Sequence, residues 1–328
     1  MKEKVLITGA SGFVGYHLVT EALNNNLDVF VAVRRSSKID HLKQFEIKYT
    51  SLEFENPSAL KKEIAEKQYD YIIHAAGVTR ARTTDEYNLI NATYTYNLAK
   101  AAAETGYVKK FVFISSLAAV GPLNNIDGII DADTTPHPVT AYGKSKLKAE
   151  ELLKTIENLN CTILRPTAVY GPRDKDIFIF FKQVAMGFEP YIGRIDQKLS
   201  FIYVADLAKA SIKALFTGNK NTYILSDDSF YNRYELANYI KVVLSNKTVK
   251  FHLPVNFVKM IAGIAEKVSS LTNKAAVLNI EKLNELKAVN WSCNIEPAKL
   301  DLDFKPAYNL QAGVTETIEW YRANKWLK

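Results

Sequence analysis

Tyr142 and Lys146 have side chains that can act together in proton transfer. They stand four residues apart, a spacing that places both on one face of a helix. A free phenol has a pKa of about 10, and an ammonium group nearby lowers it toward working pH. A tyrosine tuned in this way can give a proton to a carbonyl oxygen or take one from an alcohol. The same spacing arises by chance at the start of a surface helix, so the assignment depends on the rest of the chain.

A glycine-rich loop follows the first predicted strand. Residues 4–8 form a short apolar run, residues 9–15 read Gly-Ala-Ser-Gly-Phe-Val-Gly, and a helix is predicted over 16–24. Glycines at this spacing let the backbone turn tightly and approach a pyrophosphate at the helix N-terminus. The spacing is not the GxGxxG of many dehydrogenases. Its place between a strand and a helix nevertheless favours dinucleotide binding over a plain turn.

The second predicted strand, 28–33, ends at a pair of arginines, Arg34 and Arg35, followed by two serines. An acidic residue at this point binds the ribose 2′-hydroxyl of NAD, whereas arginines suit a 2′-phosphate. The sequence therefore predicts NADP(H) in preference to NAD(H). The alternative is that both arginines are solvated surface residues.

Later strands end in small or hydroxyl-bearing residues, at the edge of an open α/β sheet where ligands lie. A strand over 69–75 runs into Ala76 and Gly77, and a strand over 110–116 ends in Ser115 and Ser116. The remaining predicted elements are a weak strand near 45–52, helices over 58–67, 84–105 and 142–157, a long loop over 121–140, strands over 161–166 and 199–204, a helix over 205–216 and a seventh sheet strand over 223–226. From residue 230 onward the pattern is mostly helical, near 233–245, 255–270 and 280–288.

Composition narrows the class of protein. The chain has 328 residues, 48% of them apolar, which predicts one large domain and a smaller one. Its net charge of +7 is not gathered into long basic runs, so no nucleic-acid partner is expected. Two cysteines without metal-ligand spacing predict a reduced, cytoplasmic setting and no metal site. The Met-Lys-Glu-Lys start predicts no signal peptide, and no apolar run is long enough for a membrane span.

Together, and in this order, these motifs resemble the extended short-chain dehydrogenase/reductases, the NAD-dependent epimerase/dehydratase family. The matching stretches are Thr8-Gly9-x-x-Gly12-x-x-Gly15, Ala75-Ala76-Gly77, Ser115-Ser116, Tyr142-x-x-x-Lys146, Arg165-Pro166-x-x-x-Tyr170-Gly171-Pro172, residues 201–208 and residues 319–321. The resemblance implies a Rossmann-type doubly wound parallel sheet in an α/β fold, with a smaller, mostly helical C-terminal substrate domain. The expected boundaries are 1–172 plus about 199–227 for the NAD(P)-binding domain, and about 173–198 plus 228–328 for the substrate domain.

The resemblance also implies roles for individual residues. Tyr142 would be the catalytic acid/base, Lys146 would bind the nicotinamide ribose and lower the tyrosine pKa, and Ser116, or else Ser115, would hydrogen-bond the reacting oxygen. Glu53 stands where the family often has an aspartate near the adenine, and Asn91 either contacts the cofactor or packs within its helix. The expected cofactor contacts are Gly9, Ser11, Gly12, Phe13, Val14, Gly15, Arg34, Arg35, Glu53, Phe54, Ala75, Ala76, Gly77, Asn91, Ser115, Tyr142, Lys146 and Pro166.

Two features bear on the substrate. Leu199 stands where nucleotide-sugar members often carry an arginine that clamps the sugar-nucleotide pyrophosphate; the neighbouring Lys198 could substitute, although lysine lacks the bidentate fork of arginine. The strand ending at Arg34 resembles the dihydroflavonol-reductase and hydroxysteroid-dehydrogenase branches. The leading prediction is therefore an NADP-dependent oxidoreductase that reduces a carbonyl, or oxidises an alcohol, on a small apolar molecule. The alternatives are a nucleotide-sugar epimerase or dehydratase with tightly bound NAD(P), and a non-catalytic NAD(P)-binding regulatory protein.

Several segments receive plainer interpretations. His74 ends a buried strand and is expected to pack, and the aromatic run 178–181 is expected in the core. The segment 255–270 is apolar on one face, which domain packing explains more simply than membrane contact. The helices near 84–105 and 142–157 could pair with a second copy, so a homodimer is possible. Substrate identity, reaction direction and pathway stay open at this level.

Overall fold

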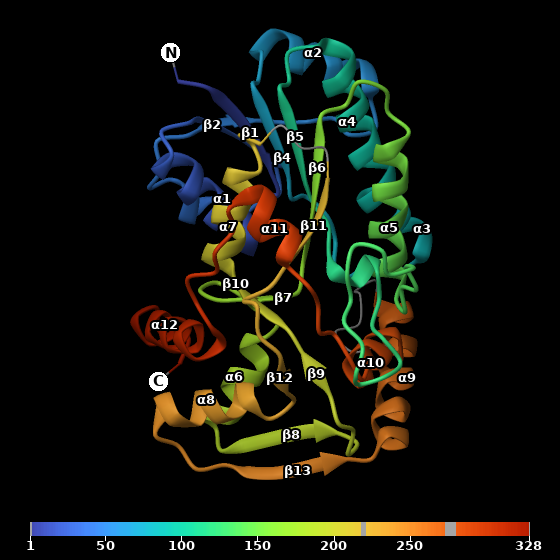
Figure 1. Cartoon of the computed structure of the whole chain (residues 1–328), viewed down its shortest axis with the longest axis vertical. Helices are drawn as coiled ribbons and strands as arrows, with labels where there is room; N and C mark the ends of the chain where they lie inside the picture. The colour runs from blue at the N-terminus through green and yellow to red at the C-terminus, as the bar shows by residue number, and fades with distance from the viewer. Residues whose placement is uncertain (1, 218–220, 273–279, 328) are drawn as a thin grey trace.

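A seven-stranded parallel sheet forms the centre of the molecule (Figure 1). The computed structural model describes residues 2–217, 221–272 and 280–327, and the side chains of 266–272 lie outside this description. In spatial order the strands are β11 (Thr222–Leu225), β6 (Cys161–Pro166), β5 (Lys110–Ile114), β4 (Tyr71–His74), β1 (Lys4–Thr8), β2 (Asp28–Ala32) and β3 (Lys48–Thr50). The predicted doubly wound sheet is confirmed, and its seventh strand, predicted over 223–226, spans Thr222–Leu225. The chain order reverses between β1 and β4, and ligands of such sheets bind beyond the carboxyl ends of the strands at this point.

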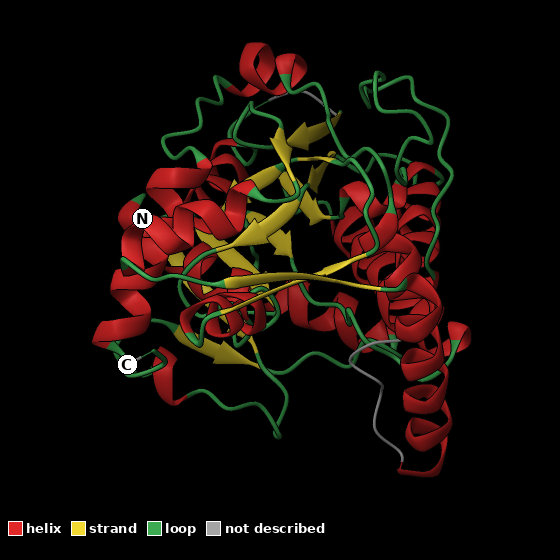
Figure 2. Ribbon diagram, turned by 90° about the horizontal axis from the view of Figure 1, so that it is seen from below, coloured by secondary structure: helices red, strands yellow, loops and turns green. Residues whose placement is uncertain are grey.

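Helices cover both faces of the sheet (Figure 2). Alternate residues of a strand point to opposite faces, so Val5 and Ile7 join one core while Leu6 joins the other. α1 (Phe13–Asn24) and α7 (Val204–Lys213) cover the first face, and α2 (Pro57–Lys67), α4 (Tyr94–Thr105) and α5 (Ala141–Lys154) cover the second. Burial on both faces explains why these strands read as continuous apolar runs.

The predicted continuous helix over 84–105 is wrong in one respect, because a π-helical turn interrupts it. α3 (Thr84–Asn88) leads into the π-turn η2 (Leu89–Thr93), and α4 follows. Such turns are rare and occur often at functional sites. Here the turn carries Asn91. Two short 3₁₀ turns, η1 (Asp40–Leu42) and η3 (Leu117–Ala119), follow strands β2 and β5.

The C-terminal part is mainly helical, as predicted, and it also contains three short strand pairs, with the predicted strand over 199–204 divided into two short strands. Its elements are β7 (Ala168–Tyr170), α6 (Phe178–Ala185), β8 (Phe188–Ile192), β9 (Lys198–Leu199), β10 (Phe201–Tyr203), β12 (Tyr231–Asn232), α8 (Glu235–Leu244), β13 (Val249–Leu253), α9 (Val255–Thr272), α10 (Ile280–Lys287), α11 (Glu296–Leu302) and α12 (Leu310–Ala323). Phe181, Ile240, Val314 and Tyr321 are fully buried in its core. Phe181 thus matches the expectation for 178–181, although Ile179 is 46% exposed.

Candidate active site

The glycine loop leaves the first turn of α1 open to an anion. Gly9 has a φ of +73°, and a Cβ there would lie 2.7 Å from the main chain of Ala75. A Cβ on Gly15 would lie 2.1 Å from the carbonyl oxygen of Gly9. Gly12, the N-cap of α1, supplies no capping side chain, and the first turn of the helix has no acidic residue. Its first backbone N–H groups are therefore suited to a phosphate, so this loop fits a dinucleotide.

His74 links β1, β4 and the π-turn through a chain of hydrogen bonds. The Ala76 N–H donates to Thr8 Oγ1 (3.1 Å), and the Thr8 hydroxyl donates to His74 Nδ1 (2.8 Å). His74 Nε2 then donates to Thr95 Oγ1 (2.9 Å), whose hydroxyl donates to the carbonyl of Asn91 (2.8 Å). Burial, with a smaller contribution from the positive charge of Lys146, lowers the pKa of His74 to about 3. The ring is a neutral structural link, in line with the packing interpretation.

Asn91 holds the loop after β4 against α5. Its Nδ2 donates to the Val78 carbonyl (2.9 Å) and to Ser145 Oγ (3.0 Å), and its Oδ1 accepts from the Val78 N–H (2.8 Å). A Cβ on Gly77 would lie 2.9 Å from this Oδ1 and 3.6 Å from Lys146 Nζ. Groups of the protein thus already form hydrogen bonds with both polar atoms of the Asn91 amide. Contact between Asn91 and a cofactor stays a prediction.

The two serines after β5 face different surroundings. The Ser115 hydroxyl donates to the buried carboxylate of Glu150. The same carboxylate accepts a hydrogen bond from the guanidinium of Arg165 in β6. Ser116 is only half-buried, caps η3 by accepting the N–H of Ala118 (3.1 Å), and hydrogen-bonds with Tyr142. The structure therefore favours Ser116 over Ser115 as the hydroxyl available to a substrate.

Local geometry explains how Tyr142 reaches Ser116. Thr140 caps α5 by accepting the N–H of Gly143 (3.0 Å), which places Tyr142 in the first turn. A Cβ on Gly143 would lie 2.3 Å from the carbonyl oxygen of Ala118, so only glycine lets α5 approach the turn η3 this closely. The contact between α5 and η3 is thus backbone against backbone, and it brings the phenol beside the serine.

Lys146 lies one turn further along α5 and is buried. Its Nζ donates to the carbonyl of Ile114 at the end of β5 (2.9 Å) and lies 4.7 Å from the centre of the Phe113 ring. Burial lowers the pKa of Lys146 to about 8, and the Glu150 carboxylate acts in the opposite direction. The ammonium is thus anchored at the carboxyl edge of the sheet.

The pKa of Tyr142 differs from the sequence-based expectation. Burial raises it to about 12, the hydrogen bond with Ser116 partly offsets this, and Glu285 and Tyr87 raise it further. The Nζ of Lys146 is directed to the carbonyl of Ile114. The phenol is therefore protonated near neutral pH.

The residues expected around the adenosine end lie at the surface beside β2 and β3. Arg34 and Arg35 are exposed, and in the described part of the chain neither guanidinium forms a hydrogen bond or an ion pair. Glu53 is exposed, while Phe54 is half-buried and stacks on Tyr94 with ring centroids 5.7 Å apart. Ser11, Phe13 and Val14 are half-buried in and after the glycine loop, Ala75 and Ala76 are half-buried after β4, and Pro166 is buried at the end of β6.

Helix α10 of the C-terminal part covers the start of α5. Glu281 of α10 accepts the N–H of Ala141 (2.8 Å), immediately before Tyr142. Tyr87 of α3 lies on another side, with its ring centroid 6.4 Å from that of Tyr142. The phenol is thus bordered by elements far apart in sequence. Nothing in the sequence pattern indicated Glu281, whereas Glu150 was detectable from its i+4 spacing to Lys146.

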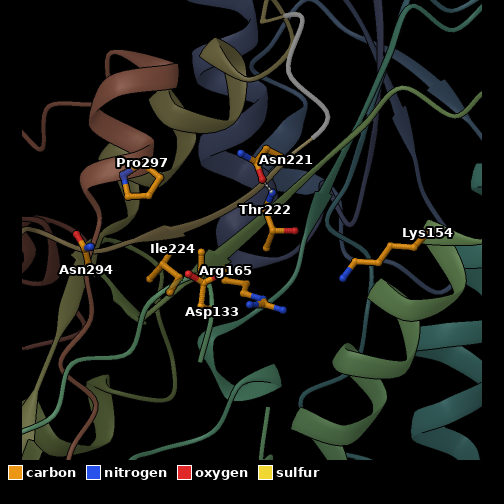
Figure 3. Close-up of a pocket in the computed structure, with 9 residues that line it drawn as sticks. Asp133, Lys154, Arg165, Asn221, Thr222, Ile224, Asn294 and Pro297 are labelled. Carbon is orange, nitrogen blue, oxygen red and sulfur yellow. Dashed lines mark hydrogen bonds between the residues drawn. The ribbon is translucent and has the colours of Figure 1, made fainter. Parts of the chain in front are cut away.

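Leu199 lies in β9, which pairs in antiparallel fashion with β12, and it packs against the C-terminal core. A separate cavity of about 340 Å³ lies at the β11 edge of the sheet (Figure 3). Arg165, Lys154 and Asp133 are among its lining residues, but Ser116, Tyr142 and Lys146 are not. This cavity is therefore distinct from the candidate active site.

The fold and the site define a Rossmann-type protein with a dinucleotide loop and a Ser-Tyr-Lys set at the carboxyl edge of its sheet. The family model of the NAD dependent epimerase/dehydratase family matches residues 5–225. The chain belongs to this family.

Three named relatives match along almost their whole length. Ceramide reductase of Caulobacter vibrioides is 28% identical over 98% of this chain and 96% of its own. UDP-glucose 4-epimerase of Vibrio cholerae is 26% identical over 97% and 95%. A sterol-4-alpha-carboxylate 3-dehydrogenase (decarboxylating) of Candida albicans is 25% identical over 97% of each chain. The family thus includes relatives with different reactions.

Solved structures share the fold. The crystal structure of UDP-glucose 4-epimerase from Thermotoga maritima, with UDP-glucose, superimposes with a TM-score of 0.81 over 98% of this chain and 99% of that one, at 21% identity. At that identity the likeness shows the architecture alone.

Proposed function

We propose that the protein is an NADPH-dependent oxidoreductase that reduces a ketone on an apolar, lipid-like substrate. The observation that supports this best is the pairing of Ser116 with a protonated Tyr142 at the carboxyl edge of the sheet, where the pKa of the phenol is about 12. A protonated phenol is the form that donates a proton, as reduction of a carbonyl requires. Oxidation of an alcohol would need the phenolate, which burial disfavours.

The residues present fit a nicotinamide dinucleotide. The glycine loop and the open first turn of α1 would hold its pyrophosphate, Arg34 and Arg35 a 2′-phosphate, and Lys146 the ribose next to the nicotinamide. When bound, this cofactor supplies the hydride that reduces the carbonyl carbon.

The chain's own groups act on the carbonyl oxygen. The Ser116 hydroxyl donates a hydrogen bond to it as negative charge develops, and the Tyr142 phenol gives it a proton. Lys146, anchored on Ile114, holds a positive charge near the reacting groups. Asn91 and Gly143 keep the loop after β4 and the start of α5 in place, so their contribution is one of positioning.

Two observations favour an apolar substrate over a sugar nucleotide. Leu199, in β9, stands where a clamping arginine would be expected for a nucleotide sugar. Two of the full-length relatives carry names of lipid chemistry, a ceramide reductase and a sterol carboxylate dehydrogenase. A ketone flanked by long alkyl chains or a steroid nucleus is the substrate class we therefore put first.

A second candidate is a nucleotide-sugar epimerase with tightly bound cofactor. The full-length similarity to the Vibrio cholerae UDP-glucose 4-epimerase favours it. Such an enzyme would consume no net NADPH, because the cofactor would be reduced and reoxidised within one turnover. A thermal shift of the cofactor-loaded protein with UDP-glucose, and none with lipid ketones, would place this candidate first.

The direct test follows NADPH oxidation with a ketone analogue of ceramide and with a steroid ketone. Tyr142→Phe should keep its NADPH affinity and lose roughly 10²–10⁴ of turnover, because the proton donor is gone. Tyr107→Phe removes a hydroxyl from a tyrosine that is 46% exposed and serves as the matched control. Unchanged turnover in Tyr142→Phe would rule out the proposed role of the phenol.

A further inference from the structure

One face of α9 carries a row of exposed apolar side chains. Successive members of the row stand at helical positions i, i+3, i+4 and i+7, which line up along one side. They are Phe257, Met260, Ile261 and Ile264, exposed to 46%, 55%, 41% and 56%. Val258 and Ala262 on the other side are 4% and 0% exposed. Domain packing therefore accounts for only part of the apolar character of this segment, and the row, called here the α9 face, is left uncovered.

Helix α9, which carries the α9 face, lies close to elements that border the candidate active site. α9 packs against α10, and both lie at the margin of the molecule below α5 (Figure 1). α10 in turn contacts the first residue of α5 through Glu281 and the N–H of Ala141. A surface that receives α9 would thus be next to the elements that border Tyr142.

We propose that the α9 face rests on the surface of a phospholipid bilayer, from which the substrate enters the site. This inference builds on the proposed reduction of a lipid ketone, since such a molecule resides in the bilayer and not in water. Over the described residues, no helix has both the length and the apolar character needed to cross a bilayer. The contact is therefore interfacial, with the apolar side chains inserted at the headgroup boundary.

The size of the α9 face favours a bilayer over a second copy of the chain. Four side chains that are about half exposed offer on the order of 400 Å² of surface, about half of the ~800 Å² that each partner contributes to a stable protein interface. A contiguous exposed apolar area of this size is enough to mark an interaction site.

Charge near the start of α9 favours an anionic bilayer. Lys259 of α9 is exposed, and Lys250 of β13 is exposed but lies 3.7 Å from the carboxylate of Glu189. The N–H of Gly193 donates to the carbonyl of Leu253 (2.9 Å), which places the exposed Arg194 beside the start of α9. Basic residues beside an apolar helix face strengthen binding to anionic lipids and make it sensitive to salt.

The test is sedimentation of the full chain with vesicles of phosphatidylcholine alone or mixed with phosphatidylglycerol. We expect the unaltered protein to bind the mixed vesicles, and Met260→Glu with Ile264→Glu to weaken binding by roughly tenfold or more, because two apolar anchors become charged. Leu300→Glu, on α11 and 75% exposed, is the matched control and should bind as the unaltered protein does. NADPH affinity, measured in parallel, should be equal in all three and shows that each is folded.

The outcomes separate this inference from the proposed function. An unaltered protein that does not bind either vesicle overturns the inference, whatever its activity on ketones. A protein that is dimeric in solution, and becomes monomeric only with Met260→Glu and Ile264→Glu, assigns the α9 face to a second copy and also overturns it. The third outcome is that the unaltered protein binds vesicles and the double variant does not, while the unaltered protein reduces no ketone. This outcome supports the bilayer contact and rules out the proposed reaction.

Discussion

Replacing Glu150 with glutamine tests the buried ion pair beneath the candidate active site. The side chains of Glu150 and Arg165 are 1% and 7% exposed. Arg165 Nη2 lies 2.5 Å from Glu150 Oε2, and its Nε lies 3.1 Å from both carboxylate oxygens. Ser115 donates to the same carboxylate. Glu150→Gln keeps the size of the side chain but leaves the guanidinium buried without its counter-charge.

The expected loss of stability is large. Removing one partner of a buried pair costs about 3–5 kcal/mol, because the other charge stays desolvated. For a chain of 328 residues that corresponds to a fall in Tm of roughly 4–7 °C. Glu151→Gln, at the exposed neighbouring position of α5, is the matched control and should move Tm little. Scanning calorimetry of both variants at pH 7 measures the difference.

The same variant should move the pH profile of ketone reduction. The Glu150 carboxylate raises the pKa of Lys146, which burial alone would depress further than about 8. Without the carboxylate, Lys146 loses its proton at a lower pH, so the alkaline fall of the reduction rate should shift to lower pH. A loss of Tm as small as that of Glu151→Gln, together with an unmoved alkaline limb, would refute this reasoning.

A double variant distinguishes the loss of the ion pair from the cost of leaving one charge buried without a partner. Glu150→Gln combined with Arg165→Met removes both charges, and well-packed apolar replacements of buried pairs are often close to neutral. The double variant should therefore recover part of the stability lost in Glu150→Gln. Ser115 keeps a polar acceptor in the glutamine, so it contributes little to the difference.

Three shorter predictions concern other parts of the site. Ser116→Ala should lower kcat for ketone reduction by roughly 10²–10³ and leave NADPH affinity unchanged, as expected for one donor to a developing oxyanion. Arg34→Ala with Arg35→Ala should weaken NADPH binding by about 10–100-fold and NADH binding far less, measured by cofactor fluorescence with Arg322→Ala as the surface control. His74→Gln should lose less stability than the unaltered protein when the pH falls from about 6.5 toward 4, since His74 stays neutral when folded but binds a proton when unfolded. Equal pH dependence in urea unfolding of both proteins would contradict the last prediction.

Much of the fold was predictable because its signals are local. Apolar runs flanked by turn residues predict the strands, and the glycine loop at residues 9–15 marks the β1–α1 junction. The order of these elements then leaves few topologies for a parallel sheet. The π-turn at Leu89–Thr93 escaped prediction because its residues suit an α-helix equally well. In the structure, Asn91 of this π-turn forms hydrogen bonds with the loop after β4. The periodicity of the sequence does not reveal these bonds.

The spacing of the sequence motif does not decide between Ser115 and Ser116 as the hydroxyl that contacts the substrate. Both serines follow the same strand, and their sequence neighbours do not distinguish them. Glu150 and Arg165 distinguish them in the folded chain, because they engage Ser115 from the adjacent helix and strand. The role given to Ser116 thus depends on a contact made across the sheet edge.

The ionisation of Tyr142 is the point where sequence and structure differ most. A lysine four residues away predicts a lowered phenol pKa, yet burial raises it to about 12 and Lys146 is bonded to Ile114. Burial of the phenol depends on elements distant in sequence, and the negative charge of Glu285 on α10 raises the pKa of Tyr142 further; the spacing of the motif reveals neither. A phenol kept protonated at neutral pH is in the form that donates a proton, as reduction of a carbonyl requires. Alcohol oxidation by the same protein should accordingly rise with pH as the phenolate becomes accessible, whereas reduction should not.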